Sequence, residues 1–258
     1  MPFCSNDYRF LRPNIKQLLK FTKSIFIVYS DHFWNGQPED NKIIERTINE
    51  NPKAKFINVP YVNKNPPIPK FICRMIPKRF LFCPVYGPRY FEGLVRWKGY
   101  LEAKKSNPDY YLFLDVDEIV DGRRLIKWLK KGLDKELNAL IFSCYDYIRS
   151  PKYQAVEWNQ KGVLVKSHDI DKKAFFTYRI RRRLFEVSPS PKKKGIVGLD
   201  GKPLIHHYSL AREYENLIKK FEITSVKPEV NPKDEVKRRI NNWRNRVEKT
   251  KPFIDFSS

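Results

Sequence analysis

The alternation of strand-like and helix-like segments near the start of the chain is the feature that most restricts its fold. Residues 24–29 form an apolar run typical of a buried strand, which ends in the polar Ser30, Asp31 and His32. Residues 38–49 repeat isoleucine on one helical face, and residues 54–59 have the pattern of a second strand. A strand–helix–strand order is typical of parallel strands joined by a crossover helix. We therefore predict an α/β fold with a mostly parallel central sheet flanked by helices, and a ligand at the carboxyl ends of its strands.

The rest of the chain extends this pattern. Proline recurs through residues 60–88, which cannot continue a helix or a central strand, so we expect an ordered excursion or a flap there. The other expected strands are 110–114, 139–147, 163–166 and 175–180, and the expected helices are 89–105, 125–133, one from residue 210 and one from 232 to about 249. A length of 258 residues suits one main domain, residues 1–226, with a basic helical extension at 227–258.

The charge balance indicates possible partners. The chain has 51 Lys and Arg against 29 Asp and Glu, a formal net charge of +22, and such an excess attracts nucleic acid, anionic membrane surfaces or phosphorylated small molecules. A Lys-rich, well-solvated surface is the alternative explanation. The sequence contains no run of about 18 apolar residues and no secretion signal, so we expect a cytoplasmic protein, soluble or peripherally bound to a membrane. Its four cysteines have no spacing suited to zinc and are expected to be reduced.

Residues 112–118, Leu-Phe-Leu-Asp-Val-Asp-Glu, carry the clearest chemical signal. Because alternate residues of a strand share a face, Asp115 and Asp117 are expected on the same side of the backbone, where they repel each other. A divalent cation, Mn²⁺ or Mg²⁺, would relieve this repulsion and bring diphosphate oxygens as further ligands. Ion pairs with the many Lys and Arg, or a solvated strand end, are the alternative.

Two segments resemble motifs of one enzyme family. Residues 109–122, DYYLFLDVDEIVDG, resemble the DxD segment of glycosyltransferases with the GT-A fold, in particular family 2-like members. Residues 204–209, LIHHYS, followed by a helix, resemble the HY motif and trailing lysine near the end of these domains. The resemblance covers about residues 22–222 and implies a GT-A-like, Rossmann-like domain.

The resemblance also implies roles for single residues. Asp115 would lie near the nucleotide ribose, Asp117 would bind the metal on the diphosphate, and Glu118 would support the loop. His207, or alternatively His206, would be a ligand of the metal or the diphosphate.

The remaining donor-binding residues follow from the same comparison. Lys219 or Lys220 would screen the leaving diphosphate. Tyr29 and Asp31 would receive the nucleotide base, although Asp31 could equally cap the next helix, and Arg89 is a further phosphate candidate with Arg96.

The acceptor base is where the chain departs from the family, because the Glu-Asp pair that many inverting members use is not found. An inverting reaction needs a carboxylate to accept the proton of the acceptor hydroxyl. The candidates are Asp146, Glu157, Asp169 and Asp200, with Asp146 and Asp200 placed best along the chain.

The expected function is therefore a metal-dependent glycosyltransferase that moves a sugar from a UDP- or GDP-linked donor to a hydroxyl of a glycan or glycoconjugate, with inversion expected. One alternative is a phosphatase of the haloacid-dehalogenase type, with Asp115 as nucleophile and Ser143 in its second motif. The other is a nucleic-acid-binding protein that uses residues 181–183, residues 192–194 and the basic C-terminal tail. No recognition helix or single-strand motif is evident, and nucleic acid is not the expected partner.

Overall fold

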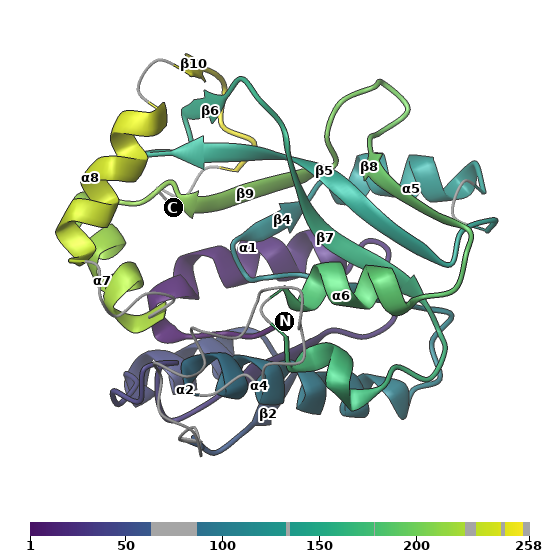
Figure 1. Cartoon of the computed structure of the whole chain (residues 1–258), viewed down its shortest axis with the longest axis horizontal. Coiled ribbons are helices and arrows are strands. Elements are labelled where there is room, and N and C mark those ends of the chain that lie inside the picture. The colour runs from purple at the N-terminus through teal and green to yellow at the C-terminus, as the bar shows by residue number, and fades with distance from the viewer. Residues whose placement is uncertain (63–86, 133–134, 178, 225–230, 244–245, 255–258) are drawn as a thin grey trace, which may run out of the picture.

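A two-stranded parallel sheet is formed near the start of the chain, in the lower part of the molecule in Figure 1. The computed structural model describes residues 1–62, 87–132, 135–177, 179–224, 231–243 and 246–254. β1 (Phe26–Tyr29) and β2 (Lys55–Asn58) pair in parallel and are joined by α2 (Asn41–Glu50). The carboxylate of Asp40 caps α2 by accepting a hydrogen bond from the backbone N–H of Ile43 at 3.2 Å. The predicted strand–helix–strand opening is confirmed.

The larger sheet corrects the prediction of a mostly parallel central sheet, because it is mixed and mainly antiparallel. Its strands run in the order β10–β6–β5–β7–β3, while β8 and β9 pair in parallel with β5, and β4 pairs with β9. The strand bounds are β3 (Tyr110–Phe113), β4 (Glu118–Val120), β5 (Ala139–Ile148), β6 (Tyr153–Ala155), β7 (Asn159–Lys166), β8 (Lys192–Ile196), β9 (Ile205–Leu210) and β10 (Val247–Lys249).

Strand partners explain this difference. β3 pairs antiparallel with β7 and not with β1. The edge of β1 is occupied by the first residues of the chain: Val28 N–H donates to Met1 O and Phe3 N–H donates to Val28 O, both at 2.8 Å. Apolar periodicity identifies a strand but carries no information about its neighbour.

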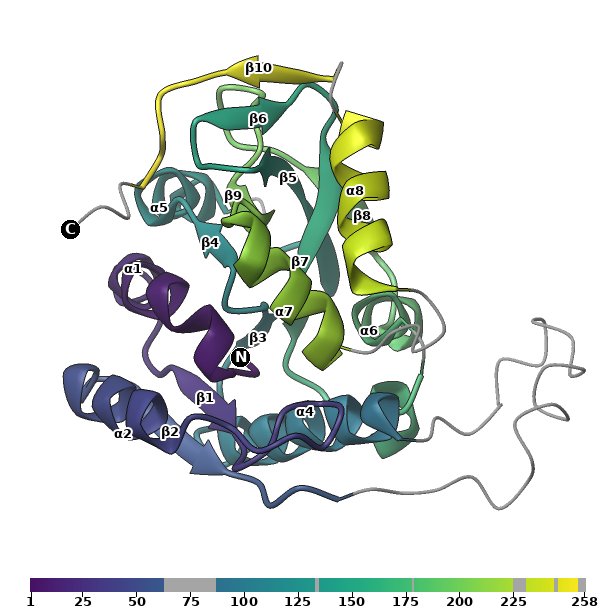
Figure 2. The same ribbon diagram turned by 90° about the vertical axis from the view of Figure 1, so that its left-hand side faces the viewer.

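The helices fill the space around and between the sheets. They are α1 (Tyr8–Leu18), α4 (Pro88–Lys104), α5 (Gly122–Lys130), α6 (Ile180–Val187), α7 (Tyr214–Thr224) and α8 (Pro232–Trp243), with short 3-10 turns at Ser5–Asp7 and Lys172–Phe175. α1, which the sequence analysis did not identify, lies between the small and the large sheet (Figure 2). It buries Phe10, Leu11 and Ile15 in the main hydrophobic core and packs against β4.

Two expected elements differ from the structure. Residues 175–180 are not a strand; among those described, they end a 3-10 turn and begin α6. Phe175, Ile180 and Leu184 are buried together against β7, at a spacing that suits helical turns as well as a strand. The helix expected to continue to about residue 249 ends at Trp243, and Val247–Lys249 instead pair with β6.

The C-terminal extension packs against the same body in its described part. Val236 of α8 is buried against Leu217 and Ile218 of α7. The ring of Phe253 stacks on His206 with the ring centroids 3.9 Å apart.

Some expectations fall outside the described residues. Most of the proline-rich segment does so, together with Cys73 and Cys83. Cys4 and Cys144 are free and buried. Of the helices in the described ranges, none combines the length and the apolar character needed to cross a membrane.

Glu39 is a buried carboxyl that ties the first residues of the chain to the loop before α2. The backbone N–H of Ser5 donates to its Oε2 at 3.1 Å, and the Ser5 hydroxyl donates to the same oxygen at 2.5 Å. Burial raises the pKa of Glu39 to about 7, from an ordinary value of 4.5, and these hydrogen bonds only partly oppose the shift.

We expect this carboxyl to make the protein less stable as pH rises from about 4.5 to about 7. In that window the folded state binds more protons than the unfolded state, so the free energy of unfolding falls with pH. At about 1.4 kcal/mol for each pKa unit, the loss is at most about 3.5 kcal/mol. Glu39→Gln should remove it, as measured by urea unfolding at about pH 5 and about pH 8. Glu45→Gln, at an exposed position on α2, should leave the wild-type pH dependence unchanged. Equal pH dependence in wild type and Glu39→Gln would contradict this assignment.

Candidate functional site

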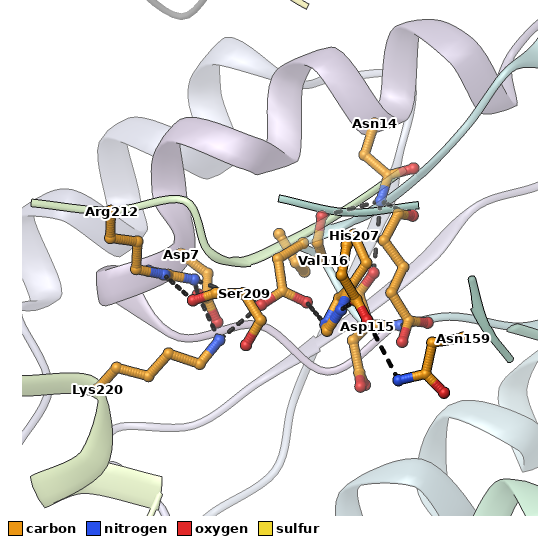
Figure 3. A network of polar contacts seen from close by, with 12 residues as sticks. Asp7, Asn14, Asp115, Val116, Asn159, His207, Ser209, Arg212 and Lys220 are labelled. Atoms are coloured by element: carbon orange, nitrogen blue, oxygen red, sulfur yellow. Dashed lines mark hydrogen bonds and ion pairs between the residues drawn. The ribbon is translucent and has the colours of Figure 1, made fainter. Parts of the chain in front are cut away.

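The acidic segment forms a tight link between β3 and β4 that is held from two sides. Asn14 of α1 donates from its side-chain amide to Val116 O at 2.9 Å and Glu118 O at 3.0 Å. On the other side, the backbone N–H of Tyr208 in β9 donates to Asp117 O at 2.8 Å. Figure 3 shows this network with Asn14, Asp115 and His207. The link is therefore fixed by contacts from distant parts of the sequence, which preorganises its side chains.

Asp115 lies in an arginine clamp. Its two carboxylate oxygens pair with Arg96 at 2.5 Å and Arg181 at 3.0 Å, and its backbone N–H donates to Glu118 Oε2 at 3.1 Å. Glu118 is fully buried and also pairs with Arg181. Burial opposes ionisation of Asp115, but the positive charges of Arg181 and Arg96 outweigh it and hold the pKa of Asp115 far below its usual range. This carboxylate is thus permanently ionised and already neutralised by protein side chains.

Asp117 belongs to a second network with different partners. Its Oδ2 lies 2.6 Å from Lys220 Nζ and 3.4 Å from an Arg212 guanidinium nitrogen, and its side chain is only 6% exposed. Arg212 is itself held by Asp7 and donates to Asn6 O. Burial again opposes ionisation, and Lys220, the nearby histidine and Arg212 together bring the pKa of Asp117 well below its usual value. One oxygen of Asp117 is occupied by cations, which leaves Oδ1 for another partner.

That oxygen faces His207. His207 lies opposite Glu118 in the β4–β9 register, and its Nε2 is 3.8 Å from Asp117 Oδ1. On the other side of the ring, Nδ1 lies 2.5 Å from Asp146 Oδ1, while Asp146 Oδ2 accepts from Asn159 at 3.2 Å. An ionised carboxylate can only accept hydrogen bonds, so Nδ1 carries a proton and Nε2 is the ring nitrogen that faces Asp117.

His206 points to the opposite face of β9, as neighbouring residues of a strand must. Its Nδ1 shares a hydrogen bond with the hydroxyl of Tyr147 at 2.8 Å, and burial lowers its pKa to about 3. We call Asp115, Asp117 and Glu118 the acidic cluster. Of the two histidines left open by the sequence, only His207 contacts this cluster, through Asp117, and His206 is a core residue.

The facing pair could hold a divalent cation. A gap of 3.8 Å between a nitrogen and an oxygen is spanned by one ion bonded to each at about 2.1 Å. The Asp146–His207 contact is the carboxylate–histidine arrangement that orients metal-ligating imidazoles. In the described part of the chain, no three His, Cys, Asp or Glu residues are grouped closely enough to hold a metal ion. An ion at this place would therefore complete its coordination with substrate or water.

The two lysines left open by the sequence have different surroundings. Lys220 contacts Asp117, whereas Lys219 lies over the ring of Phe33, 5.8 Å from its centroid. Of the two lysines, Lys220 is therefore the one that contacts the acidic segment.

Three other residues expected to bind the donor, Tyr29, Asp31 and Arg89, lie outside these two networks. Tyr29, at the end of β1, packs against Phe56. Asp31 pairs with His32 at 3.0 Å, is half exposed and accepts from the backbone of Tyr61, so it does not cap α2. Arg89 pairs with Glu92, which also contacts Arg96, and this links it indirectly to the arginine clamp.

The four candidates for the residue that accepts the acceptor's proton lie in different parts of the structure. Asp146 joins the cluster through His207. Asp200 lies in the turn before β9 and pairs with Arg124 at 2.5 Å, away from these contacts. Asp169 is exposed and pairs with Lys104, and Glu157 is exposed with Arg246 at 3.7 Å. Of these four carboxylates, the structure therefore brings only Asp146 close to the acidic cluster.

Sequence reasoning missed several members of the site. Asn14 and Asp7 come from a part of the chain to which no function was assigned, and Arg212 follows the LIHHYS segment without belonging to it. Arg181 was read only as part of a basic run. The pattern of α1 gave one usable signal, a polar Asn14 on an otherwise apolar helical face.

Comparison with known proteins leaves the site to be interpreted from its geometry. No protein-family model matches this chain, and no curated protein sequence matches it significantly.

Proposed function

We propose that this protein is a metal-dependent glycosyltransferase that transfers a sugar from a nucleoside diphosphate to a hydroxyl group of a glycan or glycoconjugate. The observation that carries the proposal is the facing pair of Asp117 and His207, 3.8 Å apart, with Lys220 on the second oxygen of Asp117. The pair joins the two segments that resemble family motifs, which are far apart in the sequence and meet through the pairing of β4 with β9. The GT-A assignment, with a UDP- or GDP-linked donor, forms part of the proposal.

Asp117 and His207 are the residues that would hold Mn²⁺ or Mg²⁺. A cation there would bind the donor diphosphate and offset the negative charge that develops as this group leaves. The mixed oxygen and imidazole ligands suit Mn²⁺ well.

The other side chains prepare the pair for this role. Asp146 keeps the Nδ1 proton of His207 in place, and Lys220 provides a positive charge on the donor side. Both oxygens of Asp146 are engaged, by His207 and Asn159, and its pKa is lowered, so we assign it to positioning His207 and not to accepting the acceptor proton.

The same geometry argues against the two alternatives. A phosphatase nucleophile needs a free carboxylate oxygen, whereas both oxygens of Asp115 are held by arginines. In the basic run proposed for nucleic acid, Arg181 points inward to Asp115 and Glu118, and Arg182 and Arg183 both lie near Glu186, so part of the charge of this run is neutralised by the protein itself.

Calorimetry with UDP and GDP, with and without Mn²⁺, tests the proposal on the whole chain. We expect one of the two nucleotides to bind in the presence of Mn²⁺ and to lose binding when EDTA is added, because the diphosphate would share the cation with the protein. Failure of both nucleotides to bind at any Mn²⁺ concentration would contradict the proposal.

Asp146→Asn is expected to weaken Mn²⁺ binding by about tenfold to a hundredfold, because His207 loses the carboxylate that fixes its tautomer. The measurement is a Mn²⁺ titration with UDP or GDP present and no acceptor. Asp200→Asn, which alters the other favoured base candidate, should leave this affinity unchanged. Unchanged Mn²⁺ affinity in Asp146→Asn, together with a lower kcat, would instead identify Asp146 as the base.

A further inference from the structure

A cavity of about 280 Å³ lies beside the Asp146–His207 pair. Its walls come from the ends of β5, β7 and β9 and from α8. Its volume lies just below the usual range for ligand sites, about 300–1,000 Å³. It is therefore suited to a single sugar-sized group. Its polar lining residues include Asp146, Asn159, Lys161, His207, Arg238 and Arg239. We call this cavity the basic pocket.

The lining charge is mainly positive. Lys161, Arg238 and Arg239 are three cations, and Asp146 is the single carboxylate among the lining residues. That carboxylate is already occupied by His207 and Asn159. The pocket consequently has more positive charge than its own walls neutralise.

The two arginines share one counterion. Glu235, one turn earlier in α8, accepts from both guanidinium groups of Arg238 and Arg239 at 2.8 Å. A single carboxylate holds both side chains in place but balances only one of their two charges. Arg238 and Arg239 are thus oriented and remain able to bind another anion.

Lys161 is the cation nearest the site. It lies on β7, where its backbone pairs with β5, and the residue is half buried. Its side-chain ammonium makes no hydrogen bond or ion pair with another residue in the described ranges. Lys161 lines the basic pocket together with Asp146 and Asn159. A half-buried ammonium without a partner is costly, and an anionic ligand would relieve that cost.

The basic pocket and the residues proposed to bind the sugar donor, Asp117 and Lys220, lie on different sides of His207. Figure 3 shows Lys220 and Arg212 on one side of the imidazole and Asn159 on the other. Asp117 faces Nε2, whereas Asp146, which lines the pocket, faces Nδ1. A donor diphosphate at Asp117 and a second molecule in the basic pocket would therefore meet at His207 without competing.

We infer that the acceptor of this protein carries an oxyanion, a phosphate or a carboxylate, which binds Lys161, Arg238 and Arg239 in the basic pocket. The inference rests on the proposed function and adds the chemical class of the acceptor. The acceptor's anion binds the cations, and its hydroxyl reaches past Asp146 toward the sugar carbon of the donor.

Affinity for matched sugars, measured by calorimetry with saturating UDP or GDP and Mn²⁺, tests the inference. Saturation with the nucleotide keeps the probes out of the donor site. Glucose, glucose 6-phosphate and glucuronate share one ring and differ in their anionic group. We expect the phosphate or the carboxylate probe to bind at least about tenfold more tightly than glucose, and the better of the two identifies the anion.

Variants locate that preference. Lys161→Met and Arg238→Gln should each remove most of the tenfold preference, and Lys161→Arg should retain it, because the charge is kept. Arg46→Gln is the matched control, since Arg46 also pairs with a glutamate one helical turn away, Glu50, and lies outside the pocket on α2. It should leave the preference unchanged.

The outcomes are distinguishable. If the three probes bind with equal affinity while the nucleotide is bound, the inference is overturned but the proposed function is not. The same holds if Arg46→Gln loses as much of the preference as Lys161→Met and Arg238→Gln do. If neither nucleotide binds with Mn²⁺, the proposed function fails and the acceptor role fails with it. A tenfold preference that is lost in Lys161→Met and kept in Arg46→Gln supports the inference.

Discussion

Asp117→Asn is expected to lower kcat/KM for the donor by about a thousandfold or more, equivalent to about 4 kcal/mol of lost transition-state stabilisation. The substitution keeps the shape of the side chain but removes the negative charge that faces His207 Nε2 and Lys220. A neutral amide is a much weaker ligand for a divalent cation, so both Mn²⁺ binding and Mn²⁺-dependent nucleotide binding should be lost. Calorimetry and donor turnover measure the two effects separately.

The control for this variant is Asp169→Asn, an exposed carboxylate paired with Lys104 outside the cluster, which should retain full activity. Asp117→Asn leaves Lys220 and Arg212 without their shared partner, so its folding must be checked by circular dichroism. A folded Asp117→Asn protein that keeps Mn²⁺-dependent turnover would contradict the role assigned to this residue.

Arg181→Gln is expected to reduce the free energy of unfolding by about 3 kcal/mol or more. Arg181 pairs with the fully buried Glu118 and with Asp115, and removing it leaves a buried carboxylate without its cation. Breaking a buried pair by removing one partner is strongly destabilising for this reason. Urea unfolding near neutral pH measures the loss.

The neighbouring residue gives a matched control. Arg182 lies on the same helix and pairs with Glu186 at the exposed surface, at i,i+4 spacing. Arg182→Gln should therefore cost no more than about 0.5 kcal/mol. If Arg181→Gln and Arg182→Gln cost the same, the arginine clamp does not stabilise the fold as described.

The arginine clamp also explains one limit of sequence reasoning at the site. The repulsion between Asp115 and Asp117 was expected to be relieved by a divalent cation, with ion pairs to Lys and Arg as the alternative. The structure gives each carboxylate its own basic partners. Part of the excess positive charge thus neutralises the carboxylates of the acidic cluster inside the protein. Spacing along the chain placed the two carboxylates together, but it could not identify Arg96 or Arg212 as their partners, because those contacts join distant segments.

The sequence by itself determined the local elements whose signals are strong. The apolar runs at β1, β3 and β5 and the strand–helix–strand opening follow from periodicity and capping, which act over a few neighbouring residues. Sequence also placed Asp117 at the end of an apolar strand. The resemblance named His207, or alternatively His206, as a ligand of the metal or the diphosphate, and only the structure shows that His207 is the one that faces Asp117. The strand predicted at residues 175–180 was wrong because a short apolar pattern fits a helix and a strand equally well.

Only the tertiary structure decided how these elements pair. β3 joins β7 in antiparallel fashion, and the first residues of the chain occupy the edge of β1, which makes the larger sheet mixed. The pairing of β4 with β9 brings His207 to Asp117, and α8 closes the basic pocket beside them. The physical reason is that hydrogen bonds between strands are formed by identical backbone groups, so the choice of partner depends on the packing of the whole core.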